Sequence, residues 1–386
     1  MKIANSVLGT FGTTVFEVMS RLAIEHGSIN LGQGFPDGSG PRHVLEKAAS
    51  SLYDSPNQYP PMLGLQELRE SVASHNKRFY DIEIDWQTET MISTGATEGL
   101  AACFFGLLNP GDEVVLIEPL YDCYLPIIKR AGGVPKLVTI RPPKWDLDPV
   151  ELRAAFSEKT KLLLLNSPQN PASKVYTYEE LSLIADLVKE FNVIAVCDEV
   201  YEHMAFGDNK HIPLMTLPGM KDRSIRIGSA GKTFSLTGWK VGYLTGHRDL
   251  IKAVAKAHQF LVFTTAPNLQ RAVAFGLRQG NDYFDNLNSA MKSKRDRLSE
   301  SLNKITGFKT VNCQGSYFLF VDIAQTEFSG TDIEFCKHIT IEAGVTAVPV
   351  SAFYQSEAPQ NFIRFCFAKE DALLDEAAAR LATHFS

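Results

Sequence analysis

Short apolar runs alternate with longer amphipathic segments through the middle of the chain. Four of these runs are continuous rather than alternating: EVVLIE (113–118), KLLLLN (161–166), VIAVCD (193–198) and SIRIGS (224–229). A continuous apolar run is typical of a strand that is buried on both faces, as in a parallel sheet. Apolar residues at helical spacing predict amphipathic helices at 65–80 and 178–191. The pattern therefore predicts an α/β fold with a mostly parallel central sheet flanked by helices.

The pattern changes after about residue 280, where a long charged helix is predicted at 283–304. Two strand-like segments follow it, YFLFVD and FIRFCF. The first forty residues are a glycine-rich arm with one short helical stretch. We therefore expect three parts: an arm with part of a small domain (1–45), a large domain (46–278) and a small α+β domain (279–386).

Composition narrows the class of protein. The 386 residues carry a formal net charge of -6, which disfavours nucleic acid as the main partner. The sequence has no apolar run of about twenty residues and no secretory signal core at its start, so we expect neither a membrane span nor export. The six cysteines are scattered without a C-x-x-C pair, which indicates buried free thiols and a cytoplasmic location.

Lys232 lies in GSAGKTF, which superficially resembles the end of a phosphate-binding loop. The position that should hold the first glycine of such a loop is Arg226, inside an apolar run, so the motif does not predict a nucleotide triphosphatase. A lysine just after a buried strand is partly desolvated, which lowers its pKa and suits it to Schiff-base chemistry with a carbonyl cofactor. For Lys232 alone, a surface lysine at a strand end is the better interpretation.

The interpretation of Lys232 changes when the polar residues that end neighbouring strands are considered with it. Asp198 follows a hydrophobic strand and is suited to keeping a pyridinium nitrogen protonated, which makes the ring an electron sink. Tyr201 and Asn170 lie in adjacent strand-end segments, from which each can donate a hydrogen bond to the same ligand. Singly, they are explained by a helix cap, core packing and an Asx-turn. Together with Lys232 they predict one site beyond the carboxyl ends of the strands.

The chain resembles the pyridoxal-phosphate-dependent aminotransferases of fold type I, in the aspartate aminotransferase superfamily. Within it, the sequence is similar to the kynurenine, glutamine and methionine aminotransferases. The motifs that carry this resemblance span nearly the whole chain in the family's order: NLGQGFPD (30–37), NQYPPMLGLQELR (57–69), STGATEGL (93–100), EPLYDCY (118–124), NSPQNP (166–171), CDEVYEH (197–203), SAGKTFSLTGWKVGY (229–243) and FIRFCFAK (362–369).

The resemblance implies pyridoxal 5′-phosphate as cofactor and assigns roles around it. Lys232 matches the lysine that binds the cofactor's carbonyl and later moves the proton. Asp198, Tyr201 and Asn170 match residues at the ring, and Tyr121 matches the aromatic residue that stacks on it. The residues matched to the phosphate contacts are Gly95, Ala96, Thr97, Ser229 and Lys240, and Tyr59 is matched to a contact made to the neighbouring subunit, which implies a homodimer with shared sites.

Arg364 matches the arginine that pairs with the substrate α-carboxylate, beside the Gly34 backbone and Asn170. Strand alternation places Ile363 and Phe365 on the opposite face from Arg364, which is how a strand directs one charge inward. Many relatives have glycine where this chain has Ser173. The missing glycine removes an easy positive-φ position, so we expect a slightly different turn without loss of activity.

The amino-acid side chain is expected to contact aromatic, neutral residues: Phe16, Phe35, Tyr121 and, from the partner subunit, Phe263. The sequence offers no evident second arginine for a side-chain carboxylate. We therefore expect an aminotransferase that moves the amino group from a large neutral, aromatic or sulfur-containing L-amino acid to a 2-oxo acid by a ping-pong mechanism.

Three alternatives stay open or are disfavoured. A cysteine-S-conjugate β-lyase would use the same residues, and an N-succinyldiaminopimelate aminotransferase would need a further cationic contact. An aminotransferase-like transcriptional regulator is disfavoured because the chain shows no helix-turn-helix extension. The nine histidines form no pair at ligand spacing, so the sequence predicts no metal site.

Overall fold

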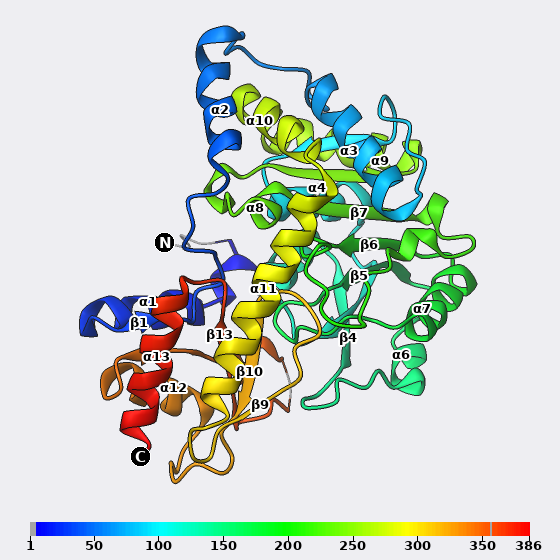
Figure 1. Cartoon of the computed structure of the whole chain (residues 1–386). Coiled ribbons are helices and arrows are strands. Elements are labelled where there is room, and N and C mark those ends of the chain that lie inside the picture. The colour runs from blue at the N-terminus through cyan, green and yellow to red at the C-terminus, as the bar shows by residue number, and fades with distance from the viewer. Residues whose placement is uncertain (1–4, 356) are drawn as a thin grey trace.

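The computed structural model describes residues 5–355 and 357–386, so residues 1–4 of the predicted arm lie outside the described part. The upper part of Figure 1 is a large sheet with helices on both faces, and the lower part is a smaller α+β unit. Among the helices of the described residues, none combines the length and the apolarity needed to cross a bilayer.

The large sheet has seven strands within the described residues, and β8 (Gly242–Gly246) runs antiparallel to the other six. The sheet is therefore mostly parallel, as predicted. Three of its strands, β2, β4 and β8, lie outside the four apolar runs that indicated the sheet. The order across the sheet is β2 (Thr90–Ser93), β8 (Gly242–Gly246), β7 (Ser224–Ser229), β6 (Ile194–Asp198), β5 (Thr160–Asn166), β3 (Glu113–Glu118) and β4 (Val134–Thr139).

The inner strands are continuously apolar because both faces of the sheet are covered. In β3, Val114 and Leu116 face one core, while Val115 and Ile117 face the other. Helices α4, α5 and α9 supply apolar side chains to the first core, and α6 and α7 to the second. The helices of this part are α2 (Arg42–Asp54), α3 (Gln66–Tyr80), α4 (Ala96–Leu107), α5 (Tyr124–Arg130), α6 (Pro149–Ala154), α7 (Tyr178–Glu190), α8 (Ala230–Thr233), α9 (Arg248–Leu261) and α10 (Pro267–Leu277).

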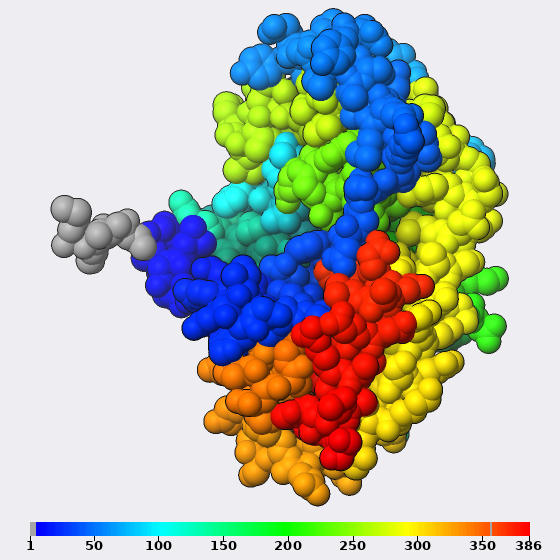
Figure 2. Space-filling view, turned by 60° about the vertical axis from the view of Figure 1, so that its left-hand side comes forward, coloured from blue at the N-terminus to red at the C-terminus, as the bar shows by residue number. Residues whose placement is uncertain are grey.

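The smaller part joins the two ends of the chain. In Figure 2 the blue amino-terminal segment lies against the orange and red carboxyl-terminal segments, and Ile29 pairs with Val345 in a two-stranded parallel sheet. The three-part division at 45/46 and 278/279 remains a prediction. The elements here are α1 (Val15–His26), β1 (Ile29–Asn30), α11 (Asn281–Leu302), β9 (Lys309–Thr310), β10 (Phe318–Asp322), α12 (Asp332–Ile341), β11 (Val345–Thr346), β12 (Val348–Pro349), β13 (Phe362–Cys366) and α13 (Asp371–His384).

Three parallel strands end at the same edge of the large sheet. Asn166 ends β5, Asp198 ends β6 and Ser229 ends β7, and the first two are paired in register. Helix α4 begins at Ala96 near this edge, and β13 brings Arg364 to it from the small part. The fold therefore gathers polar groups from distant segments at one place.

Candidate active site

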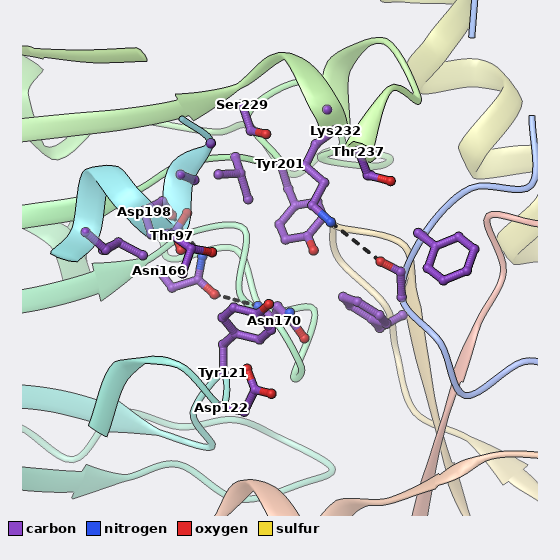
Figure 3. A pocket seen from close by; sticks show the side chains of 18 of the residues that line it. Thr97, Tyr121, Asp122, Asn166, Asn170, Asp198, Tyr201, Ser229, Lys232 and Thr237 are labelled. Carbon is purple, nitrogen blue, oxygen red and sulfur yellow. Dashed lines mark hydrogen bonds between the residues drawn. The ribbon is translucent and has the colours of Figure 1, made fainter. Parts of the chain in front are cut away.

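A cavity of about 390 Å³ lies at this sheet edge, a size suited to a small ligand (Figure 3). In Figure 3, Lys232 extends into the cavity from one side, and Tyr121 and Asp122 lie on the opposite side. Fourteen of the residues predicted for the site line it: Phe16, Gly34, Phe35, Gly95, Ala96, Thr97, Tyr121, Asn170, Asp198, Tyr201, Ser229, Lys232, Lys240 and Arg364.

Lys232 is held by α8, a single helical turn that follows β7 directly. Its Nζ donates a hydrogen bond to Tyr317 Oη at 2.7 Å and lies 3.5 Å from the Gly34 carbonyl oxygen. Burial disfavours the charged amine and lowers the pKa of Lys232 to about 8. The neutral fraction of this amine at neutral pH is therefore larger than that of an ordinary lysine, which makes the side chain a better nucleophile.

This pKa has a measurable consequence for cofactor capture. The neutral amine is the reactive form, so apoprotein should capture pyridoxal phosphate at a rate that rises with pH, bends near pH 8 and levels above it. An ordinary lysine would still show a rising rate at pH 9 to 10, because its pKa lies near 10.4. Stopped-flow absorbance between pH 6 and 10 measures the profile, and a rate that rises without a bend through pH 10 contradicts the assignment.

Asp198 ends β6 with its carboxylate buried. Oδ2 accepts a 2.6 Å hydrogen bond from Tyr124 Oη, whereas Oδ1 has no partner within the described residues. Burial raises the pKa of Asp198 to about 6. The Asn166 amide donates to the Asp198 carbonyl oxygen at 2.8 Å and fixes the strand end. An unpaired buried acceptor that lines a cavity fits a ligand with an N–H donor, such as a protonated pyridine nitrogen.

One part of the cavity lining is suited to an anion. Gly95 precedes α4 with φ 79°, and the first turn of that helix exposes N–H groups that have no partner within the helix. A Cβ on Gly95 would lie 3.0 Å from Lys240 Cε, so the glycine permits the lysine to approach closely. Ser229 adds a hydroxyl at the end of β7. These groups fit a phosphate, so the cavity as a whole fits pyridoxal phosphate.

Arg364 is the largest fully buried side chain, with 1% of its surface exposed. Its Nη1 donates to Asn170 Oδ1 at 3.1 Å and its Nη2 to the Gly32 carbonyl oxygen at 2.8 Å, while Nε has no partner within the described residues. Within that part of the chain its hydrogen-bond partners are an amide and a carbonyl oxygen, and no carboxylate forms an ion pair with it. The guanidinium packs over the rings of Phe318, Phe353 and Phe16.

Burial lowers the pKa of Arg364 to about 10, which still leaves the guanidinium charged at neutral pH. A buried cation without an acidic partner is costly, and a bound carboxylate relieves that cost through charge-assisted hydrogen bonds. The geometry therefore fits the predicted role of Arg364 in binding a substrate carboxylate.

The missing glycine was expected to change the turn after Asn170 slightly, but the structure keeps a positive φ at this position. Ser173 takes up the positive φ directly, at 59°, although it has a side chain. Its hydroxyl lies 2.9 Å from Ser316 Oγ and donates to the Phe318 carbonyl oxygen at 2.7 Å. These buried hydrogen bonds offset the strain of the left-handed conformation, so serine replaces glycine without losing the left-handed position.

Ser173→Gly should therefore relieve backbone strain, but the Phe318 carbonyl oxygen and the Ser316 hydroxyl would lose their hydrogen bonds to Ser173. We expect the free energy of unfolding to fall by about 1–2 kcal/mol, because losing buried hydrogen bonds outweighs the gain in backbone freedom. Turnover should stay within about threefold of wild type, since Asn170 is retained. Urea unfolding and steady-state kinetics measure the two effects, and an unchanged or raised stability contradicts this explanation.

Tyr59 and Phe263 are the two predicted site residues that do not line the cavity. Both are exposed, at 84% and 40%, and their rings meet edge to face with centroids 5.6 Å apart. Both residues are predicted from the sequence to belong to the active site of a neighbouring subunit. That assignment requires them to lie outside this chain's own cavity.

The structure adds residues that the sequence did not single out. Tyr124, Asp122 and Asn166 lie within motifs already noted, so their proximity to Tyr121 and Asp198 was an available signal. Tyr317 and Phe353 gave no such signal, because each reaches the site from a segment distant in sequence.

One buried cluster was not predicted either. His75, Glu202 and His203 place potential metal-ligand atoms within 4.8 Å of one another, although His75 is far in sequence from the adjacent pair Glu202 and His203. The two imidazole Nε2 atoms are 2.9 Å apart, and Glu202 pairs with Arg226 at 3.0 Å. A cation here would face the guanidinium, so these contacts describe a buried polar network.

Comparison with known proteins identifies the class that the fold and the cavity define. A family model described as aminotransferase class I and II matches residues 27–381. The chain therefore belongs to the class I and II aminotransferases. It is a pyridoxal-phosphate-dependent aminotransferase of fold type I.

Individual relatives show which aminotransferases the chain is similar to. The chain is 38% identical to a methionine aminotransferase of Escherichia coli over 98% of both chains. It is 39% identical to a probable N-succinyldiaminopimelate aminotransferase of Mycobacterium tuberculosis, over 98% of this chain and 97% of that one. A solved Escherichia coli structure with a methionine aminotransferase function superposes with a TM-score of 0.96 at 37% identity, covering 99% of this chain and 100% of the other.

Proposed function

We propose that this aminotransferase takes its amino group from a large neutral amino acid of the methionine or kynurenine type and passes it to a 2-oxo acid. The observation that carries the proposal is that Arg364 is the one arginine among the described residues that line the cavity, and that aromatic side chains lie around it. Phe16, Phe35 and Tyr121 line the cavity around it. The Escherichia coli relative supports the same donor class.

Each residue of the site has its own proposed role in the reaction. Pyridoxal phosphate, when bound, would supply an electron-withdrawing ring that stabilises negative charge developing at the donor's Cα. Arg364 and Asn170 hold the donor carboxylate, which fixes the orientation of its Cα. Lys232, neutral in part because its pKa is lowered, accepts the proton from Cα and returns it. Asp198 supplies the negative charge that keeps the ring nitrogen protonated, and Tyr121 covers the ring.

A second candidate, an N-succinyldiaminopimelate aminotransferase, is favoured by the Mycobacterium relative. That substrate carries a distal carboxylate. The cationic side chains that line the cavity, among the described residues, are Lys232, Lys240 and Arg364, and each already has a proposed role. Asp122 adds a further negative charge to the lining, which disfavours a distal carboxylate. We therefore rank this candidate second.

Half-reactions distinguish the candidates. Holoenzyme is mixed with methionine, glutamine, phenylalanine, aspartate or N-succinyldiaminopimelate, and stopped-flow absorbance follows the conversion of the cofactor to its amine form. The proposal predicts that one of the three neutral donors reacts fastest. Faster conversion by aspartate or by the succinylated substrate contradicts it, and pyruvate release from a cysteine conjugate without an oxo acid would indicate β-lyase activity.

We infer a homodimer in which Tyr59 and Phe263 complete the partner's site. Both side chains are exposed and outside this chain's cavity, and the neighbouring Phe260 is 85% exposed. Such aromatic exposure is typical of a surface that is covered in an assembly. The six free cysteines support a reducing, cytoplasmic location for this dimer.

Subunit hybrids test the shared site. Tyr59→Ala and Lys232→Ala proteins should each have low activity, and mixing them under exchange conditions should restore activity. In a mixed dimer, one site has the intact lysine of one subunit and the intact tyrosine of the other. About a quarter of all sites should recover at equal mixing with random exchange. Activity equal to the average of the two separate proteins contradicts the shared site.

A further inference from the structure

Tyr317 is fully buried directly before β10 and lies outside the residues that the family resemblance singles out. Its hydroxyl makes two short hydrogen bonds. It donates to the Gly34 carbonyl oxygen at 2.7 Å and accepts from Lys232 Nζ at 2.7 Å. One hydroxyl therefore joins the reactive amine to the segment that borders the substrate site.

The surroundings fix this hydroxyl in place. The Tyr317 ring packs edge-on against Tyr201 and Phe318, with centroids 5.0 and 4.8 Å away. The Tyr317 carbonyl oxygen accepts from the Phe367 amide at 3.1 Å. A fully packed ring with a pinned backbone cannot move its oxygen far, so the oxygen is a fixed docking point for a flexible lysine chain.

The polarity of the two hydrogen bonds matters for the chemistry. A hydroxyl has one proton, and the Gly34 carbonyl can only accept, so that proton is committed to Gly34. Tyr317 Oη therefore accepts a hydrogen bond from the Lys232 amine through one of its lone pairs. A neutral amine that donates an N–H keeps its own lone pair free. The contact thus orients the amine without consuming the electron pair that must react.

We propose that Tyr317 is a positioning residue that holds the amine of Lys232 in a reactive orientation whenever the lysine is not bonded to the cofactor. The proposal rests on the proposed role of Lys232. It gives the amine a defined location during the part of the reaction in which it moves the proton. The same Gly32–Phe35 segment contacts Arg364 through the Gly32 carbonyl oxygen, so the positions of amine and carboxylate are linked.

Cofactor capture by apoprotein tests the proposal without measuring turnover. Attachment joins the Lys232 nitrogen to the aldehyde carbon of pyridoxal phosphate and releases one water. Tyr317→Phe removes a single oxygen and keeps the ring. We expect its first-order capture rate at saturating cofactor to fall about tenfold. The concentration for half-saturation should change little, because the proposed phosphate and ring contacts are intact.

Tyr176→Phe is the matched control. Tyr176 is also a fully buried tyrosine, but its hydroxyl has no partner within the described residues and lies outside the cavity. Its capture rate should equal that of wild type. A wild-type rate for Tyr317→Phe overturns the proposal, whereas wild-type protein that captures no cofactor at Lys232 overturns the proposed function instead.

A second measurement applies should Tyr317→Phe not fold. In wild-type apoprotein labelled with ¹³C at lysine Cε, the Lys232 signal is identified by its loss in Lys232→Arg. The proposal predicts a nuclear Overhauser contact between this methylene and the Tyr317 ring protons. A mobile, exchange-averaged lysine signal without that contact contradicts it.

Discussion

Lys232→Ala should reduce turnover by at least about 10⁴-fold, because one change removes both the covalent attachment point and the group that moves the proton. The near-visible absorption band of the lysine-bound cofactor should be absent as well. The structure supports both effects, since Lys232 lines the cavity and desolvation lowers its pKa to about 8. Purified protein, steady-state kinetics and an absorption spectrum measure them.

Lys294→Ala serves as the control for this change. Lys294 pairs with Asp371 on the small part of the molecule at 2.7 Å and does not line the cavity. We expect its turnover and spectrum to equal those of wild type. Retention of the wild-type absorption band by Lys232→Ala would show that another amine holds the cofactor.

Asp198→Asn should lower kcat by about 10³-fold, the second largest effect that we expect. The substitution keeps the size of the side chain but removes the negative charge, so the ring nitrogen loses the group that favours its protonated form. The KM for the donor should change much less, because Arg364 and Asn170 are untouched. Kinetics of the variant with methionine and glutamine give both constants.

A buried acid elsewhere separates charge from folding effects. Asp332 is fully buried in the small part and accepts hydrogen bonds from Ser351. Asp332→Asn should lower thermal stability without changing kcat by more than about twofold. A kcat loss of tenfold or less for Asp198→Asn would contradict the role assigned to Asp198.

Much of the fold could be predicted from the sequence because the sheet is buried on both faces. The runs ending at Glu118, Asn166, Asp198 and Ser229 are strands with those carboxyl ends in the structure. The apolar runs did not predict strands β2, β4 and β8. Strand β2 has only four residues, β4 includes Pro135 and Lys136, and β8 mixes glycine and threonine with its apolar positions.

The candidate site, like the fold, could be predicted only in part from the sequence. Asp198 at a strand end and Asn170 in the turn after one were predictable because parallel strands present their carboxyl ends at one edge. Tyr317 was not, because its contact with Lys232 depends on how two segments 85 residues apart are packed. The left-handed conformation of Ser173 was missed for a related reason: residues 316 and 318, which stabilise it, are distant in sequence.

The aromatic surroundings of Arg364 were also only partly predictable. Alternation in FIRFC directs the arginine inward, but it does not specify which rings meet the guanidinium. Phe353 and Phe318 come from separate segments and lie 4.9 and 4.0 Å from it. Local patterns therefore predict direction and burial, whereas partners follow from the tertiary fold.

The central claim is that Lys232 carries the cofactor, and mass mapping after chemical reduction tests it most directly. Holoenzyme is treated with borohydride, which makes the lysine–cofactor bond permanent, and is then digested and analysed by tandem mass spectrometry. We predict one phosphopyridoxyl group on the peptide that contains Lys232 and none on the peptide that contains Lys240. Modification of a different lysine, or no modified peptide at all, would contradict the account.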